Sequence, residues 1–369
     1  MHQKTTIKLA VLLGMIFLFN TNLKANQDHE PSKDSTEPFK PVDFAFAHVL
    51  DAHEVHIAGE GASSITLPLP IILWTEKGLV TFLSSAFHHD NKGRYIVEKE
   101  GLNFVKYDGK IYQLNTGVTL PPAVLKTKKE MQAWLKDNAA LPLDFSITKA
   151  VFTMFLVAFL LFFVFFKVAR FYKKNGAVAP KGIVSWMEPL VLFVRDDIAE
   201  PNIGAKKDRF MPYLLTVFFF ILIGNLLGLI PWIGSPNLTG NISVTVTLAM
   251  FTLVIQLIFS KKPFWKHIFM PPGVPLALYP ILVPIEIAGI FIKPAALLIC
   301  LFANMTAGHI IVISLISIIF VKESLAWSGL SVPMALFIST LELLVAFLQA
   351  YIFTMLSALF IGTAVEEAH

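Results

Sequence analysis

Two long apolar stretches near the C-terminal end of the chain carry polar and ionisable side chains. The stretches are Leu276 to Val321 and Val332 to Ala364. Their polar residues are Glu286, Lys293, Asn304 and His309 in the first and Glu342 and Gln349 in the second. Such groups are costly inside a membrane and tend to mark ion paths there. Because carboxyl and imidazole groups can pass a proton along a track, we interpret the two stretches as parts of a proton path.

The spacing of these residues separates two helix faces. Glu286, Lys293 and Cys300 are each seven residues apart, which places them on one stripe of a helix, and Asn304 lies one turn beyond. His309 is nine residues after Cys300 and therefore faces the opposite side. The two polar residues of the second stretch are again seven residues apart, on one face. Two long helices thus carry distinct polar tracks.

Small residues flank the asparagine of the first stretch. They are Ala295, Ala296, Cys300, Ala303, Ala307 and Gly308. Small side chains let another helix approach closely. Ordinary packing within one helix bundle is the simplest explanation, and an interface with a separate helical partner is the alternative.

The composition requires a membrane environment. Hydrophobic residues make up 55% of the 369 residues and charged residues only 15%, against about 25% in soluble domains. A soluble enzyme and a disordered chain are therefore excluded. The single cysteine excludes a disulfide framework and a cysteine-rich metal site.

The distribution of apolar residues predicts the fold class. Three further apolar stretches are long enough to span a bilayer: Ile147 to Val168, Met211 to Trp232 and Ile242 to Ser260. We expect an all-α polytopic membrane protein with about five membrane helices. The last two exceed the usual span length, so each is either strongly tilted or broken. Pro284 and Pro294 could bend the first of these two.

The N-terminal third is of a different kind. Residues 1–25 have the layout of a secretory signal peptide: Lys4 and Lys8, an apolar run from Leu9 to Phe19, and a cleavage site after Ala25. An uncleaved anchor helix is the alternative. Residues 26–145 follow as a predicted small β-rich soluble domain outside the cytoplasm, and residues 146–369 form the membrane domain.

Within the β-rich domain, short runs rich in β-branched and aromatic residues predict strands over 65–73 and 79–83, and Met131 to Leu135 begins a short helix. Asp108-Gly109 predicts the turn of a hairpin over 103–113. The domain contains His48, His53, His56, His88 and His89. Their spacing fits no established zinc pattern, so we interpret them as surface or core residues and expect no metal.

Positive charge predicts the orientation, because cytoplasmic loops are enriched in Lys and Arg. The basic loops lie after the first span, before the second and after the third, whereas 231–240 contains neither Lys nor Arg and the loop after Phe320 has only Lys322. All the strongly basic loops fall on one side if the chain enters from outside. The β-rich domain is then extracytoplasmic and the C-terminus cytoplasmic.

The motifs resemble those of one family. Residues 291–309 read FIKPAALLICLFANMTAGH, residues 341–353 read LELLVAFLQAYIF, and Asn225 lies near the end of the second span. Over about Trp186 to the C-terminus this is similar to F-type ATP synthase subunit a, in a long bacterial form with a signal peptide. The resemblance implies proton translocation through two offset half-channels, with two long tilted helices lying against a ring of c subunits.

The resemblance also implies roles for single residues. His309 and Glu342 correspond to a half-channel pair, Glu286 to an acidic channel position, and Asn304 and Gln349 to polar positions near the stator arginine. A buried structural hydrogen bond is the alternative for each. The family's essential arginine falls at Cys300, and a buried thiol is neutral.

The arginine keeps the ring carboxylate ionised and separates the half-channels, so coupling is in doubt with cysteine. A mutation or sequence error, a divergent copy of the subunit, and rescue by Lys293 are the explanations left open.

Further implications concern the complex. The expected partners are the c-subunit ring, the b-subunit stalk, the other subunits and the lipid of a bacterial inner membrane, with no nucleic acid and no cofactor. The sequence contains no nucleotide-binding loop, so ATP chemistry belongs to partner subunits and the chain is not an enzyme on its own. A secondary transporter and an inactive structural copy are the competing functions, although no internal repeat typical of transporters is present. Sodium in place of protons stays open.

Overall fold

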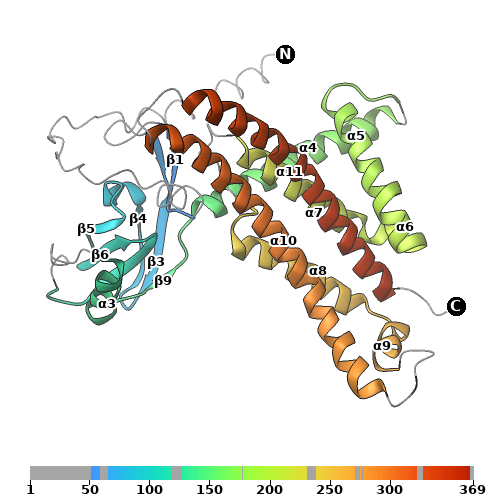
Figure 1. Cartoon of the computed structure of the whole chain (residues 1–369), viewed down its shortest axis with the longest axis horizontal. Helices are drawn as coiled ribbons and strands as arrows, with labels where there is room; N and C mark the ends of the chain where they lie inside the picture. Colours follow the sequence, from blue (N-terminus) through green and yellow to red (C-terminus); the bar gives the residue numbers. More distant parts are fainter. Residues whose placement is uncertain are drawn as a thin grey trace. The chain divides into compact units, whose positions relative to one another are not determined.

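The computed structural model describes residues 51–58, 65–118, 127–176, 178–230, 238–270, 275, 278–321 and 327–365. Antiparallel strands occupy the segment 54–144, and long helices begin at residue 149 (Figure 1). The predicted signal peptide, the linker after it, His48, the loop 231–237, Lys322 and the last four residues lie outside the described residues.

Three small antiparallel sheets make up the N-terminal domain. One pairs β1 (Glu54–Ala58) with β2 (Ile65–Pro68). The second has the order β4-β3-β9, and the third β5-β6-β7-β8. Their bounds are β3 (Pro70–Thr75), β4 (Gly78–Leu83), β5 (Lys92–Lys99), β6 (Leu102–Tyr107), β7 (Lys110–Leu114), β8 (Ala139–Ala140) and β9 (Leu143–Asp144). Helix α3 (Lys128–Asn138) precedes β8, and its N-terminus is closed by a capping box between Thr127 and Glu130.

Alternation along the strands builds the core of this domain. Ile71 and Leu73 of β3 are fully buried, as are Phe87 and Phe104 from neighbouring segments. The predicted strand over 79–83 is confirmed, whereas the run 65–73 is divided at Leu69 into β2 and β3 of different sheets. The hairpin is confirmed: its turn residues Asp108 and Gly109 both have positive φ, at 50° and 78°, as a type I′ turn requires. Strands β1, β5, β8 and β9 were not predicted.

Five helices or helix groups are long and apolar enough to cross a membrane, counting only the described residues. They are α4 (Lys149–Asn175), the run Ile183–Gly228 that ends in α7 (Lys207–Gly228), α8 (Ile242–Phe259), α10 (Tyr279–Val321) and α11 (Ser328–Val365). This is the polytopic helical fold expected from the sequence.

The two last helices are continuous, so the alternative of broken helices is wrong. α10 runs for 43 residues through both Pro284 and Pro294, and α11 runs for 38. At a rise of about 1.5 Å per residue, α10 is about 65 Å long, roughly twice the thickness of a hydrocarbon core. A helix of that length must tilt or extend beyond the bilayer.

Shorter helices connect the membrane spans. The sequence did not predict them. α5 (Ile183–Phe193) passes through a π-helical turn (Val194–Ala199) into α6 (Glu200–Ile203), which a 3-10 turn joins to α7. α9 (Lys262–Phe269) lies between α8 and α10. α5 through α7 therefore form an almost continuous helical path.

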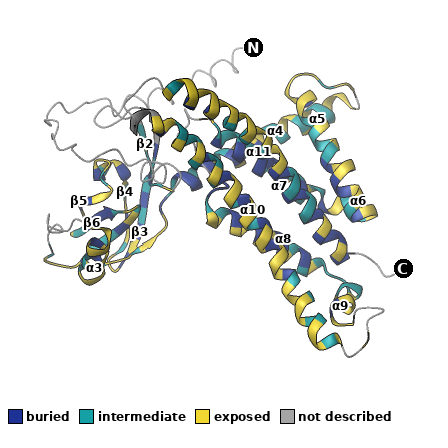
Figure 2. Ribbon diagram, viewed as in Figure 1, coloured by how far each residue is buried: buried dark blue, intermediate teal, exposed yellow. Residues whose placement is uncertain are grey.

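The packing leaves one part of the long helix pair uncovered. α7 packs along the C-terminal half of α11, where small residues are buried and where the backbone at Gly362 contacts the carbonyl of Asn202. α10 and the first half of α11 pack on each other but keep many apolar side chains exposed (Figure 2). These exposed faces can contact lipid or another membrane protein.

Candidate functional site

An amide pair joins the two long helices near their middle. Nδ2 of Asn304 on α10 donates a hydrogen bond of 2.9 Å to Oε1 of Gln349 on α11, and it also lies 3.6 Å from Sγ of Cys300. Gln349 is buried, whereas Asn304 and Cys300 are exposed. The pair therefore fixes the register of the helices one turn from Cys300.

The stripe predicted on α10 faces away from the protein interior. Lys293 and Cys300 are exposed and Glu286 is half-buried, while Leu297 and Leu301, between and beside them, are buried. Lys293 is seven residues from Cys300, which corresponds to about 10 Å along the helix. The face that carries Cys300 is thus open to contact with a separate membrane component.

His309 follows Gly308, the residue at which Glu342 of α11 contacts α10. His309 is buried. Its neighbour Gly308 lies directly against Glu342, because a Cβ placed at Gly308 would come 3.0 Å from the carboxyl carbon of that residue. Nε2 of His309 and Oε1 of Glu342 are both buried and have no hydrogen-bond partner among the described residues. Buried polar atoms are usually paired, so each of these two groups keeps a hydrogen-bonding site open among the described residues.

The polar groups divide into two sets along the antiparallel pair. His309 is five residues after Asn304 and Glu342 seven residues before Gln349, so they lie about 8 Å and about 10 Å from the level of the amide pair, toward the α10–α11 connection. Glu286 lies fourteen residues from Cys300 in the other direction, which is about 21 Å. The structure therefore places His309 and Glu342 in the same part of the helix pair and Glu286 in another, and a direct contact between His309 and Glu342 stays a prediction.

Asn225 belongs to another contact. It is fully buried near the end of α7, and its Oδ1 accepts a hydrogen bond from Oγ1 of Thr239 in the turn before α8. A Cβ at the neighbouring Gly224 would lie 3.0 Å from Leu238, so this turn packs tightly on α7. The hydrogen bond of Asn225 thus connects α7 with the start of α8 rather than with the α10–α11 amide pair.

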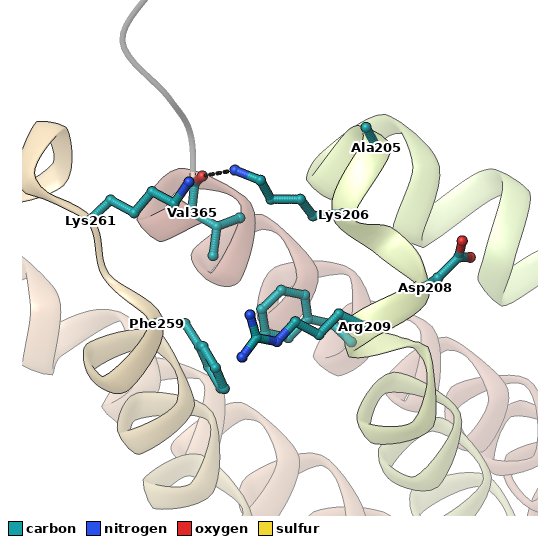
Figure 3. A pocket seen from close by; sticks show the side chains of 8 residues that line it. Ala205, Lys206, Asp208, Arg209, Phe259, Lys261 and Val365 are labelled. Carbon is teal, nitrogen blue, oxygen red and sulfur yellow. Dashed lines mark hydrogen bonds between the residues drawn. The ribbon is translucent and has the colours of Figure 1, made fainter.

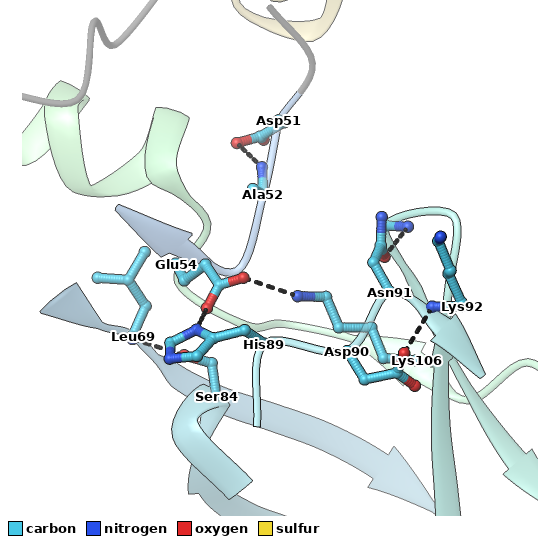
Figure 4. A network of polar contacts seen from close by, with 11 residues as sticks. Asp51, Ala52, Glu54, Leu69, Ser84, His89, Asp90, Asn91, Lys92 and Lys106 are labelled. Carbon is cyan, nitrogen blue, oxygen red and sulfur yellow. Dashed lines mark hydrogen bonds and ion pairs between the residues drawn. The ribbon is translucent and has the colours of Figure 1, made fainter. Parts of the chain in front are cut away.

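The histidines of the N-terminal domain make structural contacts. Nε2 of buried His53 lies 3.0 Å from Oδ2 of Asp144, and Nδ1 of His89 lies 2.8 Å from Oε2 of Glu54 (Figure 4). Burial raises the pKa of Asp144, but hydrogen bonds from His53 and Ser146 outweigh it and leave the pKa below its ordinary value. His56 lies in β1, and His88 follows the 3-10 turn Ser84–Phe87. Within the described residues no three candidate ligands gather into a metal-holding group.

The comparisons with known proteins agree on the membrane domain. Residues 151–362 match the family described as "ATP synthase A chain", more than half of the chain. The chain belongs to the ATP synthase subunit a family. Among its relatives, ATP synthase subunit a of Chloroherpeton thalassium is 49% identical over 238 residues, which are 61% of this chain and 70% of the relative. ATP synthase subunit a 2 of Chlorobaculum tepidum is 51% identical over 235 residues, covering 61% and 66%. The Myxococcus xanthus subunit a is 46% identical over 234 residues, covering 62% and 75%.

The N-terminal domain has a separate match. Residues 44–145 match a family described as "Domain of unknown function (DUF8433)". This subunit a family member is a multi-pass membrane protein, and the five apolar spans found among its described residues follow that domain. The match attaches no activity to the domain, so its role has to be argued from its own contacts.

A basic cavity that the sequence did not predict lies at the other end of the helices, where α7 begins and α8 and α11 end (Figure 3). It measures about 320 Å³. Nζ of Lys206 donates a hydrogen bond of 3.1 Å to the carbonyl oxygen of Val365. The guanidinium group of Arg209 lies 4.5 Å from the centre of the Phe259 ring, and Lys261 also lines the cavity. These are residues of the basic loops that predicted the cytoplasmic side.

Proposed function

We propose that this chain is the proton-channel stator subunit of an ATP synthase, and that cysteine at position 300 impairs its coupling. The observation that carries the proposal is the division of polar groups on α10 and α11 into two sets on either side of the exposed Cys300. In a rotating ring that faces this position, each carboxylate exchanges protons with one set of polar groups before it passes Cys300 and with the other set afterwards.

The His309–Glu342 pair serves the half-channel on the extracytoplasmic side. A proton that arrives at one imidazole nitrogen of His309 can leave from the other, and the carboxyl group of Glu342 can bind and release it in turn, without a net charge remaining on the relay. The open hydrogen-bonding capacity of Nε2 and Oε1 suits this role, since a relay must accept and release a proton in turn. Glu286, about 21 Å on the other side of Cys300, serves the cytoplasmic half-channel.

The Asn304–Gln349 hydrogen bond holds the two helices in the register that this relay needs. What the chain lacks at position 300 is a fixed charge. Two unit charges about 4 Å apart attract each other by about 4 kcal/mol at an effective dielectric constant of 20. A neutral thiol supplies none of this attraction, so a protonated ring carboxyl group facing Cys300 has no reason to ionise.

The orientation and partners are part of the same proposal. The signal peptide is removed, the domain over 26–145 lies outside the inner membrane of a bacterium, and the C-terminus lies in the cytoplasm. The exposed faces of α10 and α11 contact the c-subunit ring, and the b-subunit stalk holds the chain against rotation. Protons are the favoured ion, because the relay pairs an imidazole with a carboxyl group.

The test compares the chain with its Cys300→Arg variant in inverted membrane vesicles that contain the complete ATP synthase. ATP-driven acidification should be absent or weak with cysteine and strong with arginine. Cys300→Ser is the matched control, since it changes the side chain without adding charge, and it should stay as weak as cysteine. Equal pumping by all three chains would refute the coupling defect. An assembled Cys300→Arg complex that does not pump would refute the channel role and favour an inactive copy.

A further inference from the structure

We propose that the outer face of the sheet β4-β3-β9 contacts the surface of the lipid bilayer, so that the N-terminal domain lies on the membrane. The proposal goes beyond the proton path and does not depend on it, because it uses only the surface of the domain and its attachment to the spans. Its starting point is a sheet that is apolar on both faces.

Apolar side chains line both faces of this sheet. Ile71 and Leu73 of β3 point into the domain core, so the alternate residues of β3 lie on the outer face. Residues opposite each other in paired antiparallel strands share a face. The strand pairing, continued by a hydrogen bond from the N–H of Phe145 to the carbonyl oxygen of Ile72, assigns a set of large apolar residues to the outer face. They form the outer patch: Trp74, Leu79, Leu83, Leu143 and Phe145.

The outer patch is exposed in the structure. Each of its side chains has between 48% and 65% of its surface exposed. Thr81, opposite Ile72, is the polar residue on the same face. An antiparallel sheet with one face in water normally alternates apolar residues inside with polar residues outside, and soluble proteins rarely expose a large contiguous apolar surface. The outer patch therefore fits an apolar surrounding better than it fits water.

The sheet continues to the start of the first membrane span. After β9, the N–H of Ile147 donates a hydrogen bond of 3.1 Å to the carbonyl oxygen of Pro70. Thr148 then caps α4, which begins at Lys149. Leu143 is six residues before Lys149, which is about 20 Å of extended chain. The outer patch is thus tied to the end of a span by paired backbone rather than by a long linker.

Asp51 attaches the domain to two different spans. Its Oδ1 accepts a hydrogen bond of 3.0 Å from the N–H of Ala150 in α4, and the N–H of Lys149 donates 2.7 Å to the carbonyl oxygen of Ala52. Its Oδ2 accepts a hydrogen bond of 3.1 Å from Nδ2 of Asn241, the residue that caps α8. Connections to the first residues of both α4 and α8 hold the domain at the membrane end of these helices.

The bilayer is the apolar surrounding nearest to the outer patch. Phe145 is ten residues before Phe155, whose side chain is exposed on the apolar span α4 and is therefore lipid-facing. The residue types agree with this position, because tryptophan is enriched at the boundary between lipid and water, and phenylalanine and leucine enter that boundary readily. A second copy of the chain or another subunit are the alternative occupants, and the experiment separates them from lipid.

The experiment uses the full-length chain with Cys300→Ser, reconstituted into vesicles of phosphatidylethanolamine and phosphatidylglycerol. Single cysteines, Leu143→Cys or Leu79→Cys, carry a bimane fluorophore. The matched control is Glu98→Cys: its neighbour Val97 is in the domain core, so the exposed Glu98 points outward from the other sheet, on the opposite side of the domain.

Lipids with a nitroxide near the headgroup quench a fluorophore that contacts the bilayer, and iodide quenches one that is in water. The labels at positions 143 and 79 should lose most of their fluorescence to the nitroxide lipid and little to iodide. The label at position 98 should show the reverse.

Two other outcomes would overturn the proposal. If iodide quenches all three labels alike, the outer patch is open to water. If neither quencher reaches the labels at positions 143 and 79, protein covers the patch, and a disulfide-linked dimer of unlabelled Leu143→Cys would identify a second copy as the cover. None of these measurements involves pumping, so their failure is distinct from a failure of the proposed function.

Discussion

Gly308→Ala tests the contact between the two long helices at the proposed relay. The added Cβ would lie 3.0 Å from the carboxyl carbon and 3.1 Å from Cγ of Glu342, and closer still to Oε1. Glu342 or the helices must therefore shift. Overpacking of this kind destabilises the fold by about 1–3 kcal/mol. The higher helix propensity of alanine than of glycine offsets about 1 kcal/mol of this loss of stability. If the whole cost falls on the relay geometry, proton transfer slows by about 5- to 150-fold.

The assay is ATP-driven pumping by vesicles that carry Cys300→Arg, normalised to the amount of assembled complex. Gly289→Ala is the matched control: it lies on the same helix and gains the same propensity, but the nearest atom to its Cβ is Cε of Lys293 at 4.0 Å. The control should pump like its parent. Equal pumping by Gly308→Ala and Gly289→Ala would show that the Gly308–Glu342 contact does not limit proton transfer, and the relay argument would fail.

Three further predictions concern the fold. Gly362→Ala should greatly reduce the yield of folded protein on a gel-filtration profile, because the Cβ would overlap the backbone carbonyl of Asn202, whereas Gly329→Ala, with nothing within 4 Å, should not. In a Cys300→Ser background, a cysteine at Lys110 should react with an impermeant reagent only from outside, and one at Lys181 only from the cytoplasm; the reverse pattern would contradict the orientation. The depressed pKa of Asp144 predicts stability that is present above the ordinary aspartate pKa and lost as the pH falls through the lower, folded value. Hydrogen exchange over β3 and β9 should therefore rise at acidic pH in the intact chain, and Asp144→Asn should remove that dependence.

The fold was largely predictable because its signals are local. Apolar length identifies the spans, and Asp108-Gly109 identifies a hairpin through the positive φ that both residues need. The failures occur where local rules compete with packing. Pro284 and Pro294 suggested bends or breaks, yet α10 continues through both, as membrane helices can where neighbouring groups satisfy the freed carbonyls. α5 and α6 escaped prediction because charged residues and a π-helical turn interrupt their periodicity.

The part of the site that lies on α10 and α11 was predictable, because helix periodicity shows which residues share a face. Heptad arithmetic separated the face of Cys300 from that of His309, and the structure places one exposed and the other buried. The contacts of Asp51 were out of reach, because its partners lie 99 and 190 residues away along the chain. The sequence offered one hint of them, a charged residue at the first position of an apolar span. Such a residue usually lies in the headgroup region, and nothing local reveals that Lys149 is buried.

The last prediction asks whether Lys293 can replace the missing charge at position 300. Lys293 is exposed on the same stripe, about 10 Å from Cys300 along α10. At an effective dielectric constant of 20, a unit charge at that distance attracts a carboxylate facing position 300 by about 1.7 kcal/mol, against about 4 kcal/mol for a cation at 4 Å. Lys293 would therefore favour the ionised form of the ring carboxyl group about 50-fold less than a cation at 4 Å. Lys293→Ala should therefore change the weak pumping of the unmodified chain little, and in the Cys300→Arg chain it should leave most of the pumping intact. If Lys293→Ala instead abolishes substantial pumping by the unmodified chain, then Lys293 has taken over the role of the arginine, and the coupling defect assigned to Cys300 is wrong.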